Sequence, residues 1–534
     1  MRLSSNSFLG LFYYIETVNS KQKYKKVGNC MKKFSIIVVL LFLVIFSFIL
    51  NEPISSLDEL WNYSFSKNIS DGLLPYKDFN LVQTPLLFFF TAVFLKFIFN
   101  GLIVTRILGA VLAVAILIMI YLILNKLLKN KYINIFILLN ICLINIPFYT
   151  LDYNFLVLLF ALIILNYELK SKNEDLLKLN IKKDFLMGII AGLAIITKQS
   201  TGLLVAVAYV GYKWLAIRKK EDFILAFKIS LSRGLGVLVP IIIFLTYLFI
   251  TNSFGDFLSF CVFGISEFSN SISYLDLLTL GQYHISVKIL AIMVLLVIVY
   301  SFIYLIKNFR FENLENKNIL KLFVFGIASF IVVYPISDDI HFLIGSVILI
   351  ILSIYIVATH LDLEKEKVNE NFKKLVIYLN YIIFTMLIVL MCFNYYRYIT
   401  NNERTHNLNH YNGIIINGNL MKEINFINEY IEEEKLQNNN AYIVNGDASL
   451  YDIPADRYNK YFGLLLKGNL GKNGIENVIN KIEELDDNSI FLTLQDRYSL
   501  NWQVPKEVID YIKTNYNLVG KISVFDIYSK NFDI

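Results

Sequence analysis

Residues 34–394 of the chain contain long apolar runs separated by polar segments. A helix that crosses a bilayer needs about 20 mostly apolar residues. Runs of this kind cannot alternate with water-facing positions, so the pattern predicts a polytopic α-helical membrane protein. We expect eleven spans, at residues 34–50, 102–124, 132–147, 152–167, 185–197, 201–217, 229–250, 286–306, 319–335, 342–359 and 375–394.

Two parts of this threading depend on the positions of the basic residues. We expect the short run Leu86–Leu95 to lie at the membrane interface without crossing, and the stretch 185–217 to form two helices split at Thr197–Gly202. With these choices the loops on one side carry 21 Lys and Arg residues, whereas those on the other carry only Lys67, Lys77 and Lys198. Because basic loops stay in the cytoplasm, we expect the N-terminus inside the cell and the C-terminus outside.

The pattern changes after the last span. Residues 395–534 alternate amphipathic helices with short apolar strands, which predicts a small extracytoplasmic α/β domain. The expected helices are Met421–Leu436, Gly474–Leu485 and Pro505–Tyr516, and the expected strands are Ala441–Asn445, Ser489–Leu494 and Leu518–Tyr528. The expected domains are therefore a cytoplasmic segment 1–33, a membrane domain 34–394 with a first outward loop 51–101, and the domain 395–534.

The N-terminal segment is basic and poorly hydrophobic. Met31 precedes two lysines and an apolar run, so translation starts either at Met1 or at Met31. The sequence after the first span, Asn51-Glu52-Pro53, has no small-residue cleavage site. We therefore interpret this span as a retained anchor and not as a cleaved signal peptide.

Composition excludes several classes of protein. Hydrophobic residues make up 56% of the chain and charged residues 17%, against about a quarter charged in ordinary soluble domains. These values exclude a soluble globular enzyme, a disordered chain and a nucleic-acid binder. The four cysteines are far apart, without metal-ligand or disulfide spacing, and we interpret them as structural.

Acidic residues that could do chemistry gather just beyond the outward ends of the predicted spans. They are Asp58 and Glu59 in the first outward loop, Asp152 in the second, and Asp338 and Asp339, followed by His341, in the last. In a helical bundle these ends can converge on one cavity at the membrane surface. Paired carboxylates there can deprotonate an acceptor hydroxyl or hold a divalent cation, and a lysine can hold a lipid phosphate.

Each candidate also has a structural interpretation. Asp58 and Glu59 can favour a helix N-terminus capped by Ser55 or Ser56, and Asp152 can be a turn residue. Lys198 and Arg106 can extend to the lipid headgroups or bind a substrate phosphate. The group Asp338-Asp339-Ile340-His341 can be a metal cluster or a polar turn, and one His with two acids is a weak ligand set.

Several short motifs resemble the GT-C membrane glycosyltransferases, in particular family 39 and its bacterial relatives, which include protein O-mannosyltransferases and the aminoarabinose transferase of lipid A. The resemblance covers roughly residues 34–394, and it rests on the order, spacing and shared sidedness of the motifs. They are Asp58-Glu59, Pro75-Tyr76-Lys77-Asp78-Phe79, Gln83-Thr84-Pro85-Leu86, Gly192-Leu193-Ala194-Ile195-Ile196-Thr197-Lys198-Gln199, and Tyr334-Pro335 followed by Asp339 and His341.

This resemblance implies a polyprenyl-phosphate monosaccharide donor, inversion at the anomeric carbon and an active site on the non-cytoplasmic side. It implies that Asp58 is the principal catalytic or metal-associated acid, with Glu59 as its neighbour and Asp152 as the acid that shares the site. Asp58 and Asp152 are thus the candidate ligands for a divalent metal such as Mg, Mn or Zn. The candidate donor-binding residues are Lys77, Lys198, Gln199, Arg106 and His341.

The chain departs from the family in one motif. Relatives often carry a lysine in a Lys-Pro-Pro-Leu segment, where this chain has Gln83-Thr84-Pro85-Leu86. Whether Lys77 substitutes for that lysine is left open by the sequence.

The function we expect is transfer of one hexose or pentose from the lipid carrier to an extracytoplasmic acceptor such as a cell-wall polymer, a glycolipid or a protein. One alternative is a ligase or polymerase of lipid-linked oligosaccharides, although the long late loop 251–285 has no Arg or Lys. A transporter or flippase is a second alternative, but the predicted spans carry few charges. A non-catalytic sensor or scaffold is the third.

Overall fold

The structure is a computed structural model of the chain. It describes residues 21–54, 58–169, 176–267, 272–308, 313–361, 370–458, 462–498 and 505–530. Residues 1–20 of the N-terminal segment, and the capping candidates Ser55 and Ser56, lie outside the described residues.

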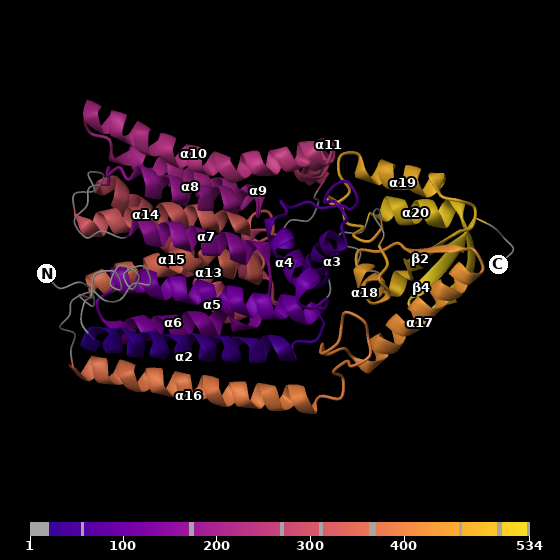
Figure 1. Cartoon of the computed structure of the whole chain (residues 1–534), viewed down its shortest axis with the longest axis horizontal. Coiled ribbons are helices and arrows are strands. Elements are labelled where there is room, and N and C mark those ends of the chain that lie inside the picture. The colour runs from indigo at the N-terminus through magenta and orange to yellow at the C-terminus, as the bar shows by residue number, and fades with distance from the viewer. Residues whose placement is uncertain are drawn as a thin grey trace.

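A bundle of long helices makes up most of the molecule (Figure 1). Its helices are α2 (Lys21–Asn51), α5 (Leu102–Leu127), α6 (Lys131–Asn145), α7 (Tyr153–Glu168), α8 (Ile181–Ile195), α9 (Gln199–Gly211), α10 (Lys220–Ile250), α13 (Ile285–Lys307), α14 (Leu314–Phe330), α15 (Asp339–His360) and α16 (Glu370–Thr400). Each coincides with one of the predicted spans, and the expected split near Thr197–Gly202 is present between α8 and α9.

Seven helices of the described part are long and apolar enough to cross a membrane: α5, α6 with the turn that follows it, α10, α13, α14 with its terminal turn, α15 and α16. The described apolar part of α2, Ser35–Asn51, and α7 are apolar but shorter, and α8 and α9 have 15 and 13 residues. These four lie among the long helices in Figure 1. The chain is therefore a multi-pass membrane protein, and the number of eleven spans stays a prediction.

Contacts at the helix ends show that α8 and α9 are antiparallel. Tyr209, near the end of α9, donates a hydrogen bond to the carbonyl of Asp184 at the start of α8. Near the opposite ends, a Cβ built on Gly202 would lie only 2.1 Å from the carbonyl oxygen of Ala194. The bundle thus has two distinct ends, one near Asp184 and one near the α8–α9 turn.

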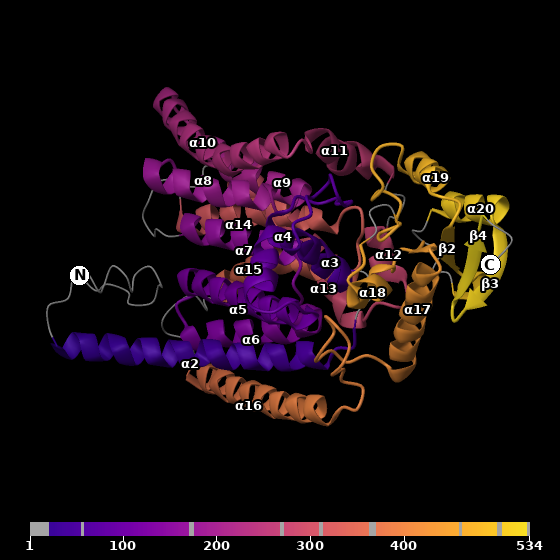
Figure 2. The same cartoon turned by 45° about the vertical axis from the view of Figure 1, so that its right-hand side comes forward.

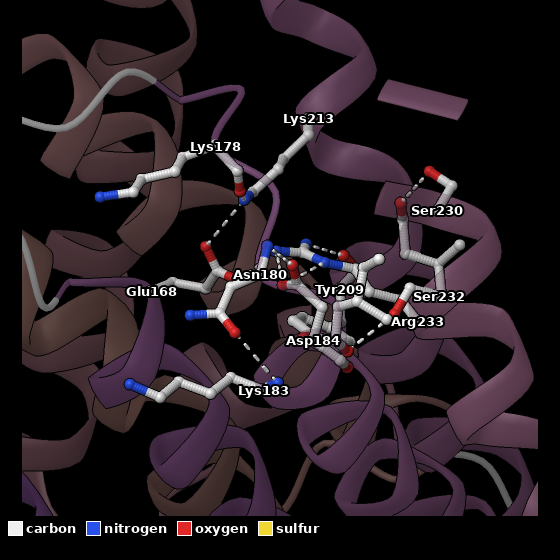
Figure 3. A network of polar contacts seen from close by, with 12 residues as sticks. Glu168, Lys178, Asn180, Lys183, Asp184, Tyr209, Lys213, Ser230, Ser232 and Arg233 are labelled. Atoms are coloured by element: carbon white, nitrogen blue, oxygen red, sulfur yellow. Dashed lines mark hydrogen bonds and ion pairs between the residues drawn. The ribbon is translucent and has the colours of Figure 1, made fainter. Parts of the chain in front are cut away.

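A buried ion network joins five helices near the Asp184 end (Figure 3). Arg233 of α10 is fully buried and bonds to Glu168 of α7 at 2.5 Å and to Asp184 of α8 at 3.0 Å. Its guanidinium also donates to the carbonyl of Tyr209 in α9 at 2.6 Å, and Lys321 of α14 donates to the carbonyl of Glu168 at 2.7 Å. Charges buried inside a membrane bundle require such partners, so the network fixes how these helices pack.

Two short helices cover the other end of the bundle: α3 (Asp58–Ser70) and α4 (Leu86–Phe97). In Figures 1 and 2 they lie between the bundle and the C-terminal part of the chain. α4 has only 12 residues, which is too short to span a bilayer. Further short helices at this end are α11 (Phe254–Leu258) and α12 (Tyr274–Thr279).

The C-terminal part contains a four-stranded sheet in the order β1-β2-β4-β3. The strands are β1 (Asn440–Ile443), β2 (Ser489–Leu494), β3 (Asn517–Ile522) and β4 (Phe525–Ser529), and the helices are α17 (Gly418–Leu436), α18 (Ser449–Asp452), α19 (Gly474–Glu484) and α20 (Lys506–Asn515). β1 and β2 are parallel, whereas β4 is antiparallel to both β2 and β3.

One prediction for this region is wrong: the segment 518–528 is a hairpin and not a single strand. The chain reverses at Ser523, which has a positive φ of 48°. Such turns usually carry Gly or Asn, and neither is present at Ser523 or Val524, so the sequence contains no turn signal.

The C-terminal part contacts α3 through ionic and hydrogen-bonded pairs. Lys67 of α3 lies 2.8 Å from Asp456, and Trp61 donates to the carbonyl of Gly446 at 3.3 Å. Asp456 also accepts from His410, whose other ring nitrogen lies 2.9 Å from the hydroxyl of Tyr63 in α3. The α/β part is thus attached to the helix that begins with Asp58.

Candidate functional site

The structure brings four of the predicted site residues to the same end of the bundle. Asp58 begins α3, Asp152 precedes α7, Lys198 precedes α9, and His341 lies in the first turn of α15. Asp152, His341 and Lys198 are all among the charges that shift the pKa of Asp58. Four segments that are far apart in sequence therefore form one electrostatically coupled cluster.

Asp58 stands in the first turn of α3, where the positive end of the helix dipole favours an acid. Its side chain is accessible to water, yet enough protein surrounds it for burial to raise the pKa of its carboxyl to about 6. The negative charge of Asp152 raises this pKa further, whereas His341 and Lys198 lower it. A carboxylate with a pKa near neutrality is suited to accept a proton during a reaction.

Asp152 and Lys198 are connected through Asn154. Asp152 is the N-cap of α7, and its side chain accepts from the backbone N–H of Asn154 at 2.6 Å. Lys198 donates to the side-chain oxygen of Asn154 at 2.7 Å and lies 5.2 Å from the ring centre of Tyr153. Burial raises the pKa of Asp152 and lowers the pKa of Lys198 to about 8, so the ammonium is still charged at pH 7.

His341 is held by the acid that caps α15. Asp338 is the N-cap residue, and its Oδ1 lies 2.8 Å from both the backbone nitrogen and the ring Nδ1 of His341. The neighbouring Asp339 is half-buried, and burial raises its pKa. This segment is therefore a helix cap as well as part of the charged cluster.

Glu59 and Arg106 bind one another beside the cluster. Two guanidinium nitrogens of Arg106 donate to the Glu59 carboxylate at 2.7 and 3.0 Å. The same guanidinium also donates to the backbone carbonyls of Ile49, Glu52 and Pro53. Arg106 is only 3% exposed. The pair ties α5 to α3 and to the end of α2, so we leave Glu59 and Arg106 out of the proposed reaction.

Lys77 and Gln199 form hydrogen bonds with segments outside the cluster. Lys77 is exposed and donates to the carbonyl of Thr251, after α10, at 3.4 Å. The side-chain amide of Gln199 donates to the carbonyl of Val82 at 2.8 Å, which ties the first outward loop to the start of α9. Neither residue is among the chief influences on the pKa of Asp58 or Asp152.

The candidate metal ligands Asp58 and Asp152 are not part of a larger group of ligands among the described residues. No group of three or more His, Cys, Asp or Glu side chains is arranged to hold a metal ion in the part of the chain that the structure describes. One oxygen of Asp152 is occupied by the helix cap. We therefore derive no step through a metal.

Sequence reasoning missed two residues that support this site. Tyr153 and Asn154 contact Lys198. Tyr153 and Asn154 follow Asp152 directly in the sequence, so their position beside a candidate acid could have indicated that they belong to the site. Their contact with Lys198 required the packing of α7 against the α8–α9 turn, which a single sequence does not reveal.

At the level of sequence, no protein-family model and no curated protein matches the chain. Solved structures do match its fold. ArnT from Cupriavidus metallidurans bound to undecaprenyl phosphate superposes with a TM-score of 0.55 at 12% identity, over 94% of this chain and 98% of that one. The apo form of ArnT gives a TM-score of 0.54 at 13% identity, with the same coverage.

A third match is the oligosaccharyltransferase AglB from Archaeoglobus fulgidus, in complex with an inhibitory peptide and a dolichol-phosphate. Its TM-score is 0.50 at 12% identity, over 94% of this chain and 75% of that one. ArnT and AglB are membrane glycosyltransferases of the GT-C superfamily. The chain therefore has the GT-C fold, and the resemblance noted in its motifs is confirmed at the level of fold.

Proposed function

We propose that the chain is a glycosyltransferase that moves one monosaccharide from a polyprenyl-phosphate carrier to a hydroxyl acceptor outside the cytoplasm. The observation that carries the proposal is the cluster of Asp58, Asp152 and Lys198 at one end of a GT-C bundle. It combines a base with a pKa near neutrality and a cation for a phosphate. The structures of ArnT with undecaprenyl phosphate and of AglB with a dolichol-phosphate support this kind of donor.

In the proposed reaction, the acceptor oxygen attacks the anomeric carbon of the donor sugar. The bond from that carbon to the phosphate oxygen breaks, and polyprenyl phosphate leaves with the bonding electron pair. Asp58 takes the proton from the acceptor hydroxyl, while Lys198 balances the charge of the phosphate. Attack opposite the leaving group inverts the anomeric centre.

We place the site on the outer side of the membrane because the loops at the opposite end of the bundle carry most of the Lys and Arg residues. Residues 34–394 would then form the catalytic membrane domain, and residues 395–534 an outer domain attached to α3. Its contacts with α3 support a role in guiding the acceptor toward Asp58.

Cysteine labelling tests the orientation. Asn488 lies at the outer domain's surface and Lys182 is exposed at the start of α8. A membrane-impermeant maleimide is expected to label Asn488→Cys in intact cells, and Lys182→Cys only after permeabilisation, with the parent chain as the background. The reverse pattern would invert the proposed topology.

The pH dependence of kcat/KM follows from the two shifted pKa values. Asp58 must be ionised to accept a proton, so the rate is expected to rise with pH through about 6. Lys198 must be charged to hold the phosphate, so the rate is expected to fall above about 8. The profile is therefore bell-shaped, with apparent pKa values that belong to the coupled cluster.

Lys198→Arg provides the matched comparison, because arginine stays charged far above pH 8. We expect this variant to lose the fall in rate on the basic side while keeping the rise on the acidic side. If kcat/KM of Lys198→Arg falls above pH 8 as it does in the parent, Lys198 does not have its proposed role.

The direct test of the donor is a panel of polyprenyl-phosphate sugars, incubated with the purified protein and a crude cell-envelope acceptor, with and without a chelator. Mass spectrometry of released polyprenyl phosphate identifies the sugar. We expect release to continue in the chelator. Release of polyprenyl diphosphate from oligosaccharide donors, with none from these monosaccharide donors, would instead favour an oligosaccharide ligase.

A further inference from the structure

Asn154, in the first turn of α7, lies between an acid of the cluster and its lysine. The residue is only 5% exposed. Its backbone N–H donates to Asp152 at 2.6 Å, and its side-chain oxygen accepts from the Lys198 ammonium at 2.7 Å. The Asn154 side chain also forms a hydrogen bond to the Asp152 carboxylate. One neutral amide therefore connects a buried acid to the cation of the proposed phosphate site.

The Lys198 ammonium bonds to this amide although two acids are near. Burial lowers the pKa of Lys198, and the charges of Asp152 and Asp58 partly offset this effect. In the part of the chain that the structure describes, Lys198 forms no ion pair with either acid. Its ammonium contacts the Asn154 oxygen and lies 5.2 Å from the ring centre of Tyr153. Because a lysine has a flexible four-carbon stem, these two contacts determine where its charge lies.

The position of the ammonium matters because an ion pair would withdraw it from a substrate. Opposite charges attract strongly in a partly desolvated site, so Lys198 would pair with Asp58 or Asp152 if no other group bound it. Such a pair would neutralise the charge that a phosphate requires. A hydrogen bond to a neutral amide fixes the ammonium and leaves its charge uncompensated.

From this geometry we infer that Asn154 is a positioning residue for Lys198. Its amide keeps the ammonium from pairing with Asp58 or Asp152, so that the cation stays available to the phosphate of the donor. The inference rests on the proposed function. The bond from the Asn154 backbone to Asp152 does not depend on the side chain, so the cap of α7 is retained when the side chain is replaced.

Asn154→Leu removes the amide with little change in the size of the side chain. We expect the affinity for undecaprenyl phosphate, measured by native mass spectrometry in detergent, to fall by about tenfold, as when one charge-assisted hydrogen bond is weakened. In a Lys198→Met background, the same substitution is expected to change this affinity by less than about twofold, because Asn154 acts through Lys198.

The pH dependence of this binding separates positioning from a merely structural role. In the parent, affinity is expected to fall as the pH rises through about 8, where Lys198 loses its proton. In Asn154→Leu the lysine pairs with a native acid, and in Asn154→Asp it pairs with the new carboxylate. Because an ion pair raises the pKa of a lysine, the fall in affinity is expected at higher pH in both variants.

Asn145→Leu is the matched control. Asn145 is a buried amide at the end of α6 that donates to the carbonyl of Ile141 in the same helix. Its replacement is expected to leave both the affinity for undecaprenyl phosphate and the pH of its fall as in the parent.

Two outcomes would overturn the inference: parental affinity and pH dependence in Asn154→Leu, or an equal loss of affinity with and without Lys198. If Asn154→Leu is not recovered as folded protein, Asn154→Asp decides, and a fall in affinity at the parental pH would then contradict the inference. Failure of the proposed function has a different signature, because the parent itself would then release no polyprenyl phosphate from any donor of the panel.

Discussion

Replacement of Asp58 by Asn is expected to lower kcat for sugar transfer by about 10²–10⁴-fold, the usual contribution of a general base. The amide keeps the shape of the side chain but cannot accept the acceptor's proton. Because Lys198 is unchanged, affinity for undecaprenyl phosphate is expected to change little. The measurement is single-turnover transfer together with donor binding on the same preparation.

Asp71→Asn is the matched control, because Asp71 directly follows α3 and its exposed side chain pairs with the buried Lys67 at 2.7 Å. Lys67 keeps its second partner, Asp456, at 2.8 Å in this variant, so the variant is expected to keep the parent's rate. Full activity of Asp58→Asn, with Asp71→Asn also active, would show that another group accepts the proton.

Replacement of Arg233 by Met is expected to lower the free energy of unfolding by about 3–5 kcal/mol. The change leaves Glu168 and Asp184 buried without their common partner, and unpaired buried charges are costly. The measurement is unfolding by denaturing detergent, followed by intrinsic fluorescence. Combining Arg233→Met with Glu168→Gln and Asp184→Asn is expected to restore part of the loss, because no carboxylate is then left unpaired.

Arg397→Met controls for the loss of an arginine as such. Arg397 is exposed near the end of α16 and lies 5.9 Å from the ring of Phe393. Its replacement is expected to leave stability within about 0.5 kcal/mol of the parent. An equal effect of the two substitutions would mean that the buried network does not hold the helices together.

Most of the fold could be predicted from the sequence, because apolar run length and basic loops are strong physical constraints in a membrane. The positions of α5, α13 and α15 follow directly from their runs. The break at Thr197–Gly202 also followed from charge, since a single helix would have moved basic loops to the other side. The hairpin at Ser523 did not, because its turn lacks the residues that usually mark one.

The candidate site could be predicted only in part. Asp58, Asp152, Lys198 and His341 all border helix starts at one end of the bundle, so topology alone predicts that they gather there. Whether a side chain at this end can take part in a reaction, or is already bound to a neighbour, depends on how the helices pack.

The pairing of Arg106 with Glu59 connects residues that are 47 positions apart, and nothing in the local sequence marks them as partners. Arg233 had a signal that was overlooked, since an arginine inside a predicted span is costly without buried acids. Its partners, Glu168 and Asp184, lie in a polar loop region of the sequence and looked like ordinary loop residues.

The most direct test of the account is the stoichiometry of transfer from a labelled polyprenyl-phosphate monosaccharide. The parent protein and Asp58→Asn would be incubated with this donor and a cell-envelope acceptor. The modified acceptor and the released polyprenyl phosphate would be quantified by mass spectrometry. The account predicts one sugar added to the acceptor for each polyprenyl phosphate released by the parent, and formation of both products at least about 10²-fold more slowly by Asp58→Asn. Acceptor modification without release of polyprenyl phosphate, or equal transfer by both proteins, would contradict it.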